Sequence, residues 1–87
     1  MTTTAIPARV RDRDAWTNGF AHRLNVALAA DKPGVNARIE ELCAVTGIDR
    51  TRVYAWRTGK ALPNAHAVAL LVAYYQDIPT DVMLGVI

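Results

Sequence analysis

Apolar residues recur along this chain at intervals of three and four, which is the spacing of one face of an α-helix. The alternation of apolar and polar residues that marks a half-buried strand is visible nowhere in the sequence. Glycines, prolines and capping residues divide the helical pattern into short segments. The pattern therefore predicts an all-α fold, a compact bundle of about five short helices.

The first predicted helix covers residues 14–30, with Asp14 as its N-cap. Gly19 within this span costs on the order of 1 kcal/mol relative to alanine, so a later start near Thr17 is the alternative. One face of the helix carries the large apolar residues, which are Trp16, Phe20, Leu24, Ala27 and Leu28. The segment Lys32-Pro33-Gly34 then ends the helix, because proline and glycine interrupt helical structure.

The next segment predicts a second helix that ends in a tight turn. Asn36 is its expected N-cap, and its buried stripe consists of Ile39, Leu42 and Cys43. Gly47 stands where the backbone must take a positive φ to reverse direction, which glycine does at little cost. We expect the residue that follows, Ile48, to close the turn from below.

A third helix is predicted directly after this turn, with Asp49 as its N-cap. Val53 and Trp56 are three residues apart and point inward, so we interpret the tryptophan as core rather than as a base-stacking residue. Gly59 has the position of a C′ residue, and Pro63 blocks continuation of the helix.

The C-terminal third predicts a helix from Asn64 to about Gln76 and a last helical turn within residues 82–87. The core face of the helix that begins at Asn64 consists of Val68, Leu71, Val72 and Tyr75. Several apolar residues have no obvious place inside this pattern: Leu70, Tyr74, Val82, Met83, Val86 and Ile87. Either they complete a small core or they form the surface of a homodimer.

Composition places the chain among single-domain globular proteins. It has 87 residues, of which 52% are hydrophobic, and chains of this length form one domain. Cys43 is the single cysteine, so no internal disulfide can form and a reducing compartment is expected. Residues 1–20 lack the apolar run of a secretory signal, and the most apolar segment, Ala65 to Tyr75, is shorter than the about 20 residues that span a bilayer. We therefore expect a cytoplasmic protein without membrane contact.

Positive charge is concentrated near the third predicted helix, although the net charge is only +2. Four cations, Arg50, Arg52, Arg57 and Lys60, lie between residues 48 and 60 beside a single acid, Asp49. Residues 61–87 contain neither lysine nor arginine. A short helix with an apolar underside and cations outside is suited to a DNA groove; the alternative is an ordinary solvated helix face.

Residues 1–14 precede the first helical pattern, and we interpret them as a flexible arm. Arg9, Arg11 and Arg13 alternate along it with a partial offset from acidic neighbours. Such an arm either contacts a DNA minor groove or is a solvated tail. The folded domain is then expected to cover residues 15–87.

Catalytic and metal-binding chemistry finds little support in the sequence. The chain contains no serine, and Cys43 lies on a predicted buried stripe, where thiols are usually inert. His22 and His66 have no cysteine or carboxylate partners at metal-ligand spacing. We therefore expect no enzymatic activity, no metal and no cofactor, and no small-molecule ligand is evident.

Residues 36–84 carry a pattern of small and apolar residues at fixed spacing. Leu42-Cys43 is followed by Gly47 and Asp49, and then by Val53, Trp56 and a Gly-x-x-x-Pro segment that ends at Pro63. This pattern resembles the helix-turn-helix family of lambda repressor and Cro proteins, which includes many small bacterial regulators. Two departures concern the phosphate clamp of that family: Arg38-Ile39 replaces the usual Thr-Gln, and Arg57 replaces the usual glutamate.

The resemblance implies a helix-turn-helix over residues 37–58, with residues 50–58 as the recognition helix in the major groove. The positions that would read bases are Arg50, Thr51, Tyr54 and Ala55. The positions that would contact phosphates are Arg38, Arg52, Arg57, Thr58 and Lys60. An arginine at Arg50 suits guanine O6 and N7, while Tyr54 has packing on the surface as its alternative.

Three functions are compatible with the sequence. The first is a transcriptional regulator of the repressor or Cro type that binds a two-fold operator on double-stranded DNA as a homodimer. The second is a protein-interaction module with the same fold, such as an antitoxin. The third is a non-specific architectural DNA binder, which the small net charge of +2 argues against.

Overall fold

The structure is a computed structural model and describes residues 5–30 and 34–86. Six helices and no strand occur within these ranges, so the predicted all-α bundle is confirmed. The helices are α1 (Ala8–Arg11), α2 (Arg13–Ala29), α3 (Val35–Thr46), α4 (Arg50–Arg57), α5 (Ala65–Tyr74) and α6 (Thr80–Met83). The fourth, α4, is the predicted recognition helix.

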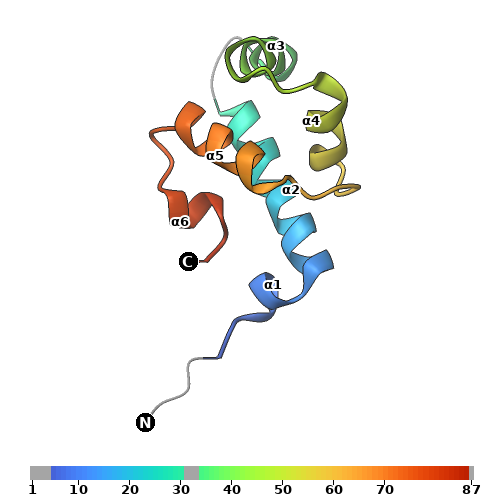
Figure 1. Cartoon of the computed structure of the whole chain (residues 1–87), viewed down its shortest axis with the longest axis vertical. Coiled ribbons are helices and arrows are strands. Elements are labelled where there is room, and N and C mark those ends of the chain that lie inside the picture. The colour runs from blue at the N-terminus through green and yellow to red at the C-terminus, as the bar shows by residue number, and fades with distance from the viewer. Residues whose placement is uncertain (1–4, 31–33, 87) are drawn as a thin grey trace.

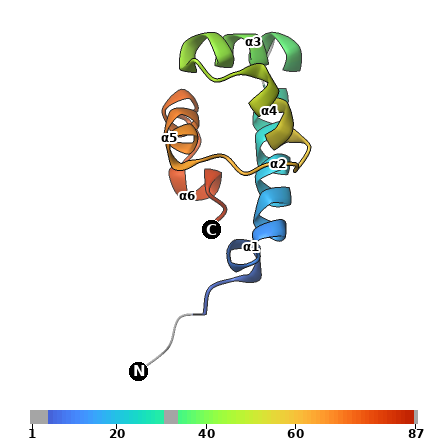
Figure 2. The ribbon, with the colours of Figure 1, turned by 45° about the vertical axis from the view of Figure 1, so that its right-hand side comes forward.

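The longest helix, α2, forms the axis of the molecule (Figure 1). Helix α3 crosses one end of α2, and α4 and α5 lie on different sides of it, as both views show (Figures 1 and 2). Helix α6 follows α5 along the same side, and α1 lies at the other end of α2, away from α3. Helices α3 and α4 therefore pack directly on a helix that the first third of the chain supplies, whereas α5 packs chiefly on α3.

The core lies between α2 and the four helices that follow it. Its fully buried large side chains are Phe20, Leu24, Leu28, Ile39, Leu42, Val53, Trp56, Leu71 and Met83. Burying one such side chain contributes roughly 1.5–3 kcal/mol, so this cluster supplies most of what holds the helices together. The ring of Phe20 stacks on half-buried Trp16, with centroids 5.2 Å apart, and meets Trp56 edge-on at 6.5 Å. Trp56 is thus a core residue, as its spacing predicted.

The ends of the helices confirm two of the four predicted N-caps. Asp49 Oδ1 accepts a hydrogen bond from Thr51 N at 3.2 Å, and Asn64 Oδ1 accepts one from Ala67 N at 2.7 Å. The other two predictions were wrong. Asp12, not Asp14, caps α2, because α1 ends at Arg11 and leaves Asp12 in an extended conformation.

Helix α3 likewise begins two residues earlier than the sequence predicted. Its N-cap is Gly34, which has no side chain to cap with, and Asn36 lies inside the first turn. The expected stop at Lys32 and Pro33 lies outside the described residues.

Three side chains from the N-terminal half bind the carbonyl groups at the end of α6. The donors are spaced seven residues apart: Arg9 to Gly85 O (3.2 Å) and Val86 O (3.4 Å), Trp16 to Leu84 O (2.8 Å), and Arg23 to Met83 O (3.0 Å). The last carbonyls of a helix have no partner within it, and cations suit that end of its dipole. We call these three donors the C-terminal clasp.

The burial of the C-terminal apolar residues decides part of the question whether they complete the core or form a surface between subunits. Met83 is 1% exposed, so it completes the core and cannot contribute to a surface between subunits. Val82 and Val86 are exposed, whereas Leu70 and Tyr74 are half-buried against the core. Ile87 lies outside the described residues.

Two glycines with the same backbone conformation test how tightly the clasp is packed. Gly47 and Gly85 have φ values of 75° and 74°, and a side chain in this region costs roughly 1–2 kcal/mol. A Cβ on Gly47 would meet nothing within 4 Å, while one on Gly85 would lie 2.7 Å from Arg23 Nη1. We expect Gly47→Ala to lower the unfolding free energy in urea by about 1–2 kcal/mol, and Gly85→Ala to lower it by a further 1–3 kcal/mol, roughly the cost of overpacking. Equal losses would contradict the clasp.

Candidate nucleic-acid interface

The turn between α3 and α4 sets the direction of α4. Gly47 takes the predicted left-handed conformation, and its N–H donates to Cys43 O at 2.9 Å. The hydroxyl of Thr46 donates to Leu42 O at 2.6 Å and accepts from Ile48 N at 3.2 Å. Ile48 is buried beneath the turn. The two helices are therefore joined by a short segment whose polar groups are bonded internally.

Helix α4 has a buried face and an exposed face. Val53 and Trp56 lie in the core, while Arg50, Thr51 and Tyr54 are exposed on the other side. Arg52 is exposed next to Trp56, and Ala55 is half-buried. Cationic side chains on a helix that is anchored in the hydrophobic core can contact a ligand with little loss of conformational freedom. Of the predicted base-reading residues, Arg50, Thr51 and Tyr54 are therefore exposed on the outward surface, which we call the α4 face (Arg50, Thr51 and Tyr54).

Arg50 leans toward α3. Its Nη2 donates to Glu40 Oε1 at 3.1 Å, and both side chains are at least half exposed. An exposed ion pair of this kind contributes only about 0–1 kcal/mol, so little free energy is lost when the arginine moves to another acceptor.

Aromatic rings support two further arginines of α4. The guanidinium of Arg52 lies 5.3 Å from the centroid of Trp56, and that of Arg57 lies 5.5 Å from the centroid of Tyr54. Contacts of this type contribute about 0.5–1 kcal/mol at exposed sites. They also restrict where each cation points, which makes Tyr54 a support for Arg57 as well as an exposed residue.

The last turn of α4 is fastened to α2 by a reciprocal pair of hydrogen bonds. Arg57 Nε donates to Asn25 Oδ1 at 2.7 Å, and Asn25 Nδ2 donates to Arg57 O at 3.1 Å. Gly59, just after α4, also lies close to α2, since a Cβ there would be 2.7 Å from Asn18 Oδ1. Sequence reasoning missed Asn25, although it is the one polar residue in the apolar run 24–30.

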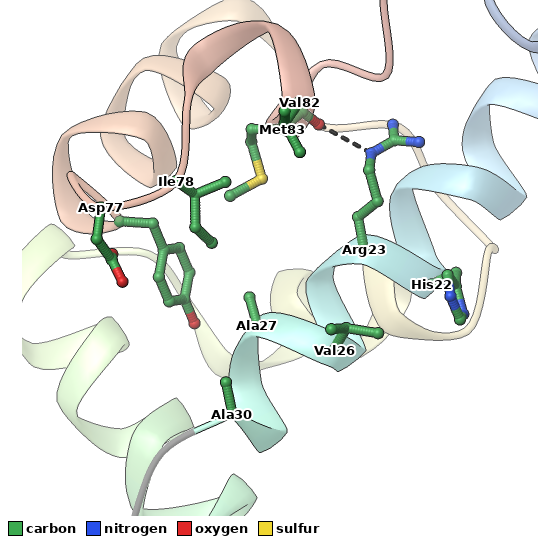
Figure 3. A pocket seen from close by; sticks show the side chains of 10 residues that line it. His22, Arg23, Val26, Ala27, Ala30, Asp77, Ile78, Val82 and Met83 are labelled. Atoms are coloured by element: carbon green, nitrogen blue, oxygen red, sulfur yellow. Dashed lines mark hydrogen bonds between the residues drawn. The ribbon is translucent and has the colours of Figure 1, made fainter. Parts of the chain in front are cut away.

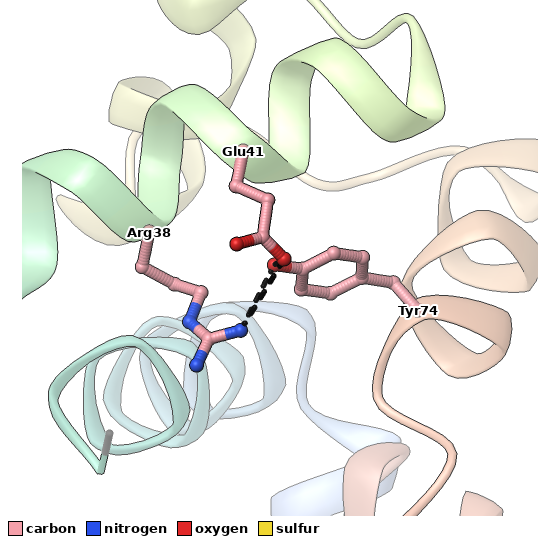
Figure 4. Close-up of polar contacts among 3 residues, drawn as sticks. All are labelled: Arg38, Glu41 and Tyr74. Atoms are coloured by element: carbon pink, nitrogen blue, oxygen red, sulfur yellow. Dashed lines mark hydrogen bonds and ion pairs between the residues drawn. The ribbon is translucent and has the colours of Figure 1, made fainter. Parts of the chain in front are cut away.

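Arg38, predicted to contact phosphate, faces α5 instead. Its Nη1 donates to the Tyr74 hydroxyl at 3.1 Å and lies 3.5 Å from Glu41 Oε1, and the hydroxyl donates to the same carboxylate oxygen at 2.7 Å (Figure 4). The Arg38 side chain is only 17% exposed. It therefore connects α3 to α5 and would have to leave this triad to reach a phosphate.

The remaining predicted positions are divided between the exposed surface and internal contacts. Lys60 is exposed beyond the end of α4, and the Thr58 hydroxyl donates to Tyr54 O at 2.9 Å. In the predicted arm, Arg13 is exposed and Arg11 Nη1 donates to Ile6 O at 3.5 Å. Arg9 belongs to the clasp, and residues 8–11 form the helical turn α1. The structure thus does not gather the three arm arginines around one site.

The described residues offer little support for catalytic, metal-binding or membrane-spanning chemistry. Burial raises the pKa of the Cys43 thiol, which makes it less nucleophilic at neutral pH. Within residues 5–30 and 34–86, no group of three His, Cys, Asp or Glu side chains is arranged to hold a metal ion. Among the described helices, none combines the length and apolar character needed to cross a bilayer.

Comparison of the chain with protein-family models, with curated proteins and with solved structures found no match in any of the three.

Asn25 offers a test of how α4 is held. Asn25→Ala removes both hydrogen bonds to Arg57, and we expect the unfolding free energy in urea to fall by about 1–3 kcal/mol. Asn36→Ala is the matched control, because Asn36 is exposed on α3 and a surface change there stays within about 0.5 kcal/mol. Similar effects of the two variants would show that the Asn25 pair contributes nothing to stability.

The triad predicts a pH dependence at the alkaline end. Burial is the main cause that raises the pKa of Tyr74 above the value of about 10 in an unfolded chain. The folded protein then keeps this proton at higher pH than the unfolded chain, so its stabilising effect is complete below pH of about 10 and is lost as pH rises further. We expect the unfolding free energy of Tyr74→Phe, measured in urea, to fall less than that of the parent as the pH rises above about 10. Tyr54→Phe, on the exposed α4 face, is the control; a profile for Tyr74→Phe that parallels the parent would contradict the assignment.

Proposed function

We propose that the protein is a sequence-specific regulator that binds double-stranded DNA with α4 in the major groove. One observation supports this most strongly: Val53 and Trp56 anchor α4 in the core while Arg50, Thr51 and Tyr54 stay exposed on its outer side. A helix of this kind, preceded by a tight turn and a second helix, is the usual reading device of helix-turn-helix proteins. The proposed role requires no catalytic step.

The proposed base contacts come from the first half of α4. Arg50 would exchange its exposed ion pair with Glu40 for guanine O6 and N7, a contact that discriminates by about 1–3 kcal/mol. Thr51 is exposed next to it and suits a thymine methyl group. Ala55, half-buried, would contribute only at the margin of this surface.

The proposed phosphate contacts come from Arg52 and Lys60, both exposed beside the base-reading positions. Phosphate contacts fix the register of a protein on the duplex without reading its sequence. Arg38 and Arg57 already bind partners inside the protein. Their first role is therefore to hold α3 and α4 in place, and a phosphate contact from either requires the exchange of those bonds.

A two-fold operator remains part of the proposal. In a dimer, two α4 helices would lie about 34 Å apart, one turn of DNA. The exposed valines Val82 and Val86 are the described members of the predicted dimer surface that a second copy can reach. Such a regulator acts where the DNA is, so we place it in the cytoplasm, on the nucleoid when bound.

The decisive experiment selects bound sites from a random duplex pool and then compares variants on the selected site. We expect Arg50→Ala to weaken binding by about 1–3 kcal/mol and to relax the preference at one base position. Lys60→Ala should weaken all sequences alike and reduce the salt slope by about one. Both are measured by fluorescence anisotropy at several salt concentrations.

The outcomes separate the candidate functions. Binding without sequence preference and with a steep salt dependence would indicate a non-specific DNA binder. Unchanged binding by both variants would reject the assignment of α4. Failure of the parent chain to select any duplex would leave a protein-interaction module as the remaining function.

A further inference from the structure

We propose that the pocket between α2 and α6 binds a small, uncharged and mainly apolar molecule. The pocket has a volume of about 380 Å³ and lies between the second half of α2 and residues 75–83 (Figure 3). Ligand sites typically have volumes of roughly 300–1,000 Å³. The proposal does not rest on DNA binding, since neither wall of the pocket belongs to α4.

Aliphatic side chains form both walls. Val26 on α2 and Val82 on α6 are 55% and 43% exposed, and Ala27, Ile78 and Met83 lie between them. Two large β-branched side chains are thus held in contact with water on opposite sides of one concavity. A ligand that displaces this water gains the free energy of burying apolar surface on both walls at once.

The charged groups argue for a ligand without charge. Arg23 contributes its aliphatic stem, but its Nε donates to Met83 O at 3.0 Å (Figure 3). The guanidinium carbon lies 5.8 Å from the centroid of the Trp16 ring. An anionic head group would therefore meet a cation whose Nε is already bonded and whose Nη2, although it has no hydrogen-bond partner, is buried out of reach, together with the carboxylate of Asp77 at one end of the pocket. A cationic head group would lie beside the Arg23 charge, which burial already disfavours, as its lowered pKa shows.

The size of the surface argues for a small molecule over a second copy of the chain. A stable protein interface buries about 800 Å² on each partner, far more than five aliphatic side chains and their rim can supply. His22 and Asp77 mark the two ends of the pocket (Figure 3), so polar groups limit the apolar surface in both directions. The concavity fits one hydrocarbon ring or a short branched chain.

The test uses three probes that share one hydrocarbon body: cyclohexylmethanol, cyclohexylmethylamine and cyclohexanecarboxylate. Each is titrated into the full chain, and binding is followed through the amide signals of residues 22–30 and 75–83 in two-dimensional NMR spectra. We expect saturable binding of the alcohol, and about tenfold weaker binding of the charged probes because burying an uncompensated charge is costly.

Two substitutions locate the binding site. Val26→Thr and Val82→Thr each replace one methyl group by a hydroxyl, and each should raise the Kd of the alcohol about fourfold, the factor for one apolar carbon removed from burial. Val45→Thr is the matched control, because Val45 is an exposed valine (67%) on α3, outside this pocket, and should leave the Kd unchanged.

Several results would overturn the proposal. These are the absence of saturation in the millimolar range, equal binding of the three probes, or an equal loss of affinity in Val45→Thr. Sedimentation that shows a dimer weakened by Val26→Thr and Val82→Thr, with no probe binding, would assign the surface to a second copy instead. The dimer result would overturn the pocket and at the same time support the two-fold assembly proposed above, in which Val82 belongs to the subunit surface. Duplex selection by α4 is measured independently of all these results, so the two proposals fail separately.

Discussion

The burial of Trp56 against Phe20 is the constraint on which the rest of the structure depends. Both side chains are inaccessible to water, and their rings meet edge-on at 6.5 Å. This contact fixes α4 to α2, and because Val53 is buried one turn earlier, it also fixes which side of α4 remains outside. An exposed row of cations on α4 follows from where the apolar residues of that short helix had to go.

Polar contacts then limit how far α4 can move relative to α2 and α3. The reciprocal bonds between Asn25 and Arg57 hold its C-terminal end, and the Arg38–Tyr74–Glu41 triad holds α3, which precedes it. Both groups are half-buried, where a hydrogen bond left unmade would cost about 1–3 kcal/mol. Arg38 and Arg57, which the sequence predicted to contact a ligand, therefore serve first to hold the helices together through internal hydrogen bonds.

The clasp links the two ends of the described chain. Arg9, Trp16 and Arg23 supply donors to the carbonyl groups of residues 83–86, at the end of the four-residue helix α6 and just beyond it. It also fixes α6 against α2, and so creates the apolar pocket beside Arg23. The short terminal helix owes its place to side chains from about sixty to seventy-seven positions earlier.

By itself, the sequence determined the helical class, the inward residues Val53 and Trp56, the turn at Gly47 and the caps Asp49 and Asn64, because each depends on neighbours within about one helical turn. The start of α2 was predicted two residues late, since Asp14 and Asp12 are both good caps and the α1 turn decides between them. Tertiary structure alone decided which arginines face the solvent. Arg50 and Arg57 are seven residues apart on one helix and look equivalent in sequence. Only the packing of the helices brings Glu40 to Arg50 and Asn25 to Arg57. The clasp and the pocket depend on the same kind of distant contact, which no local pattern encodes.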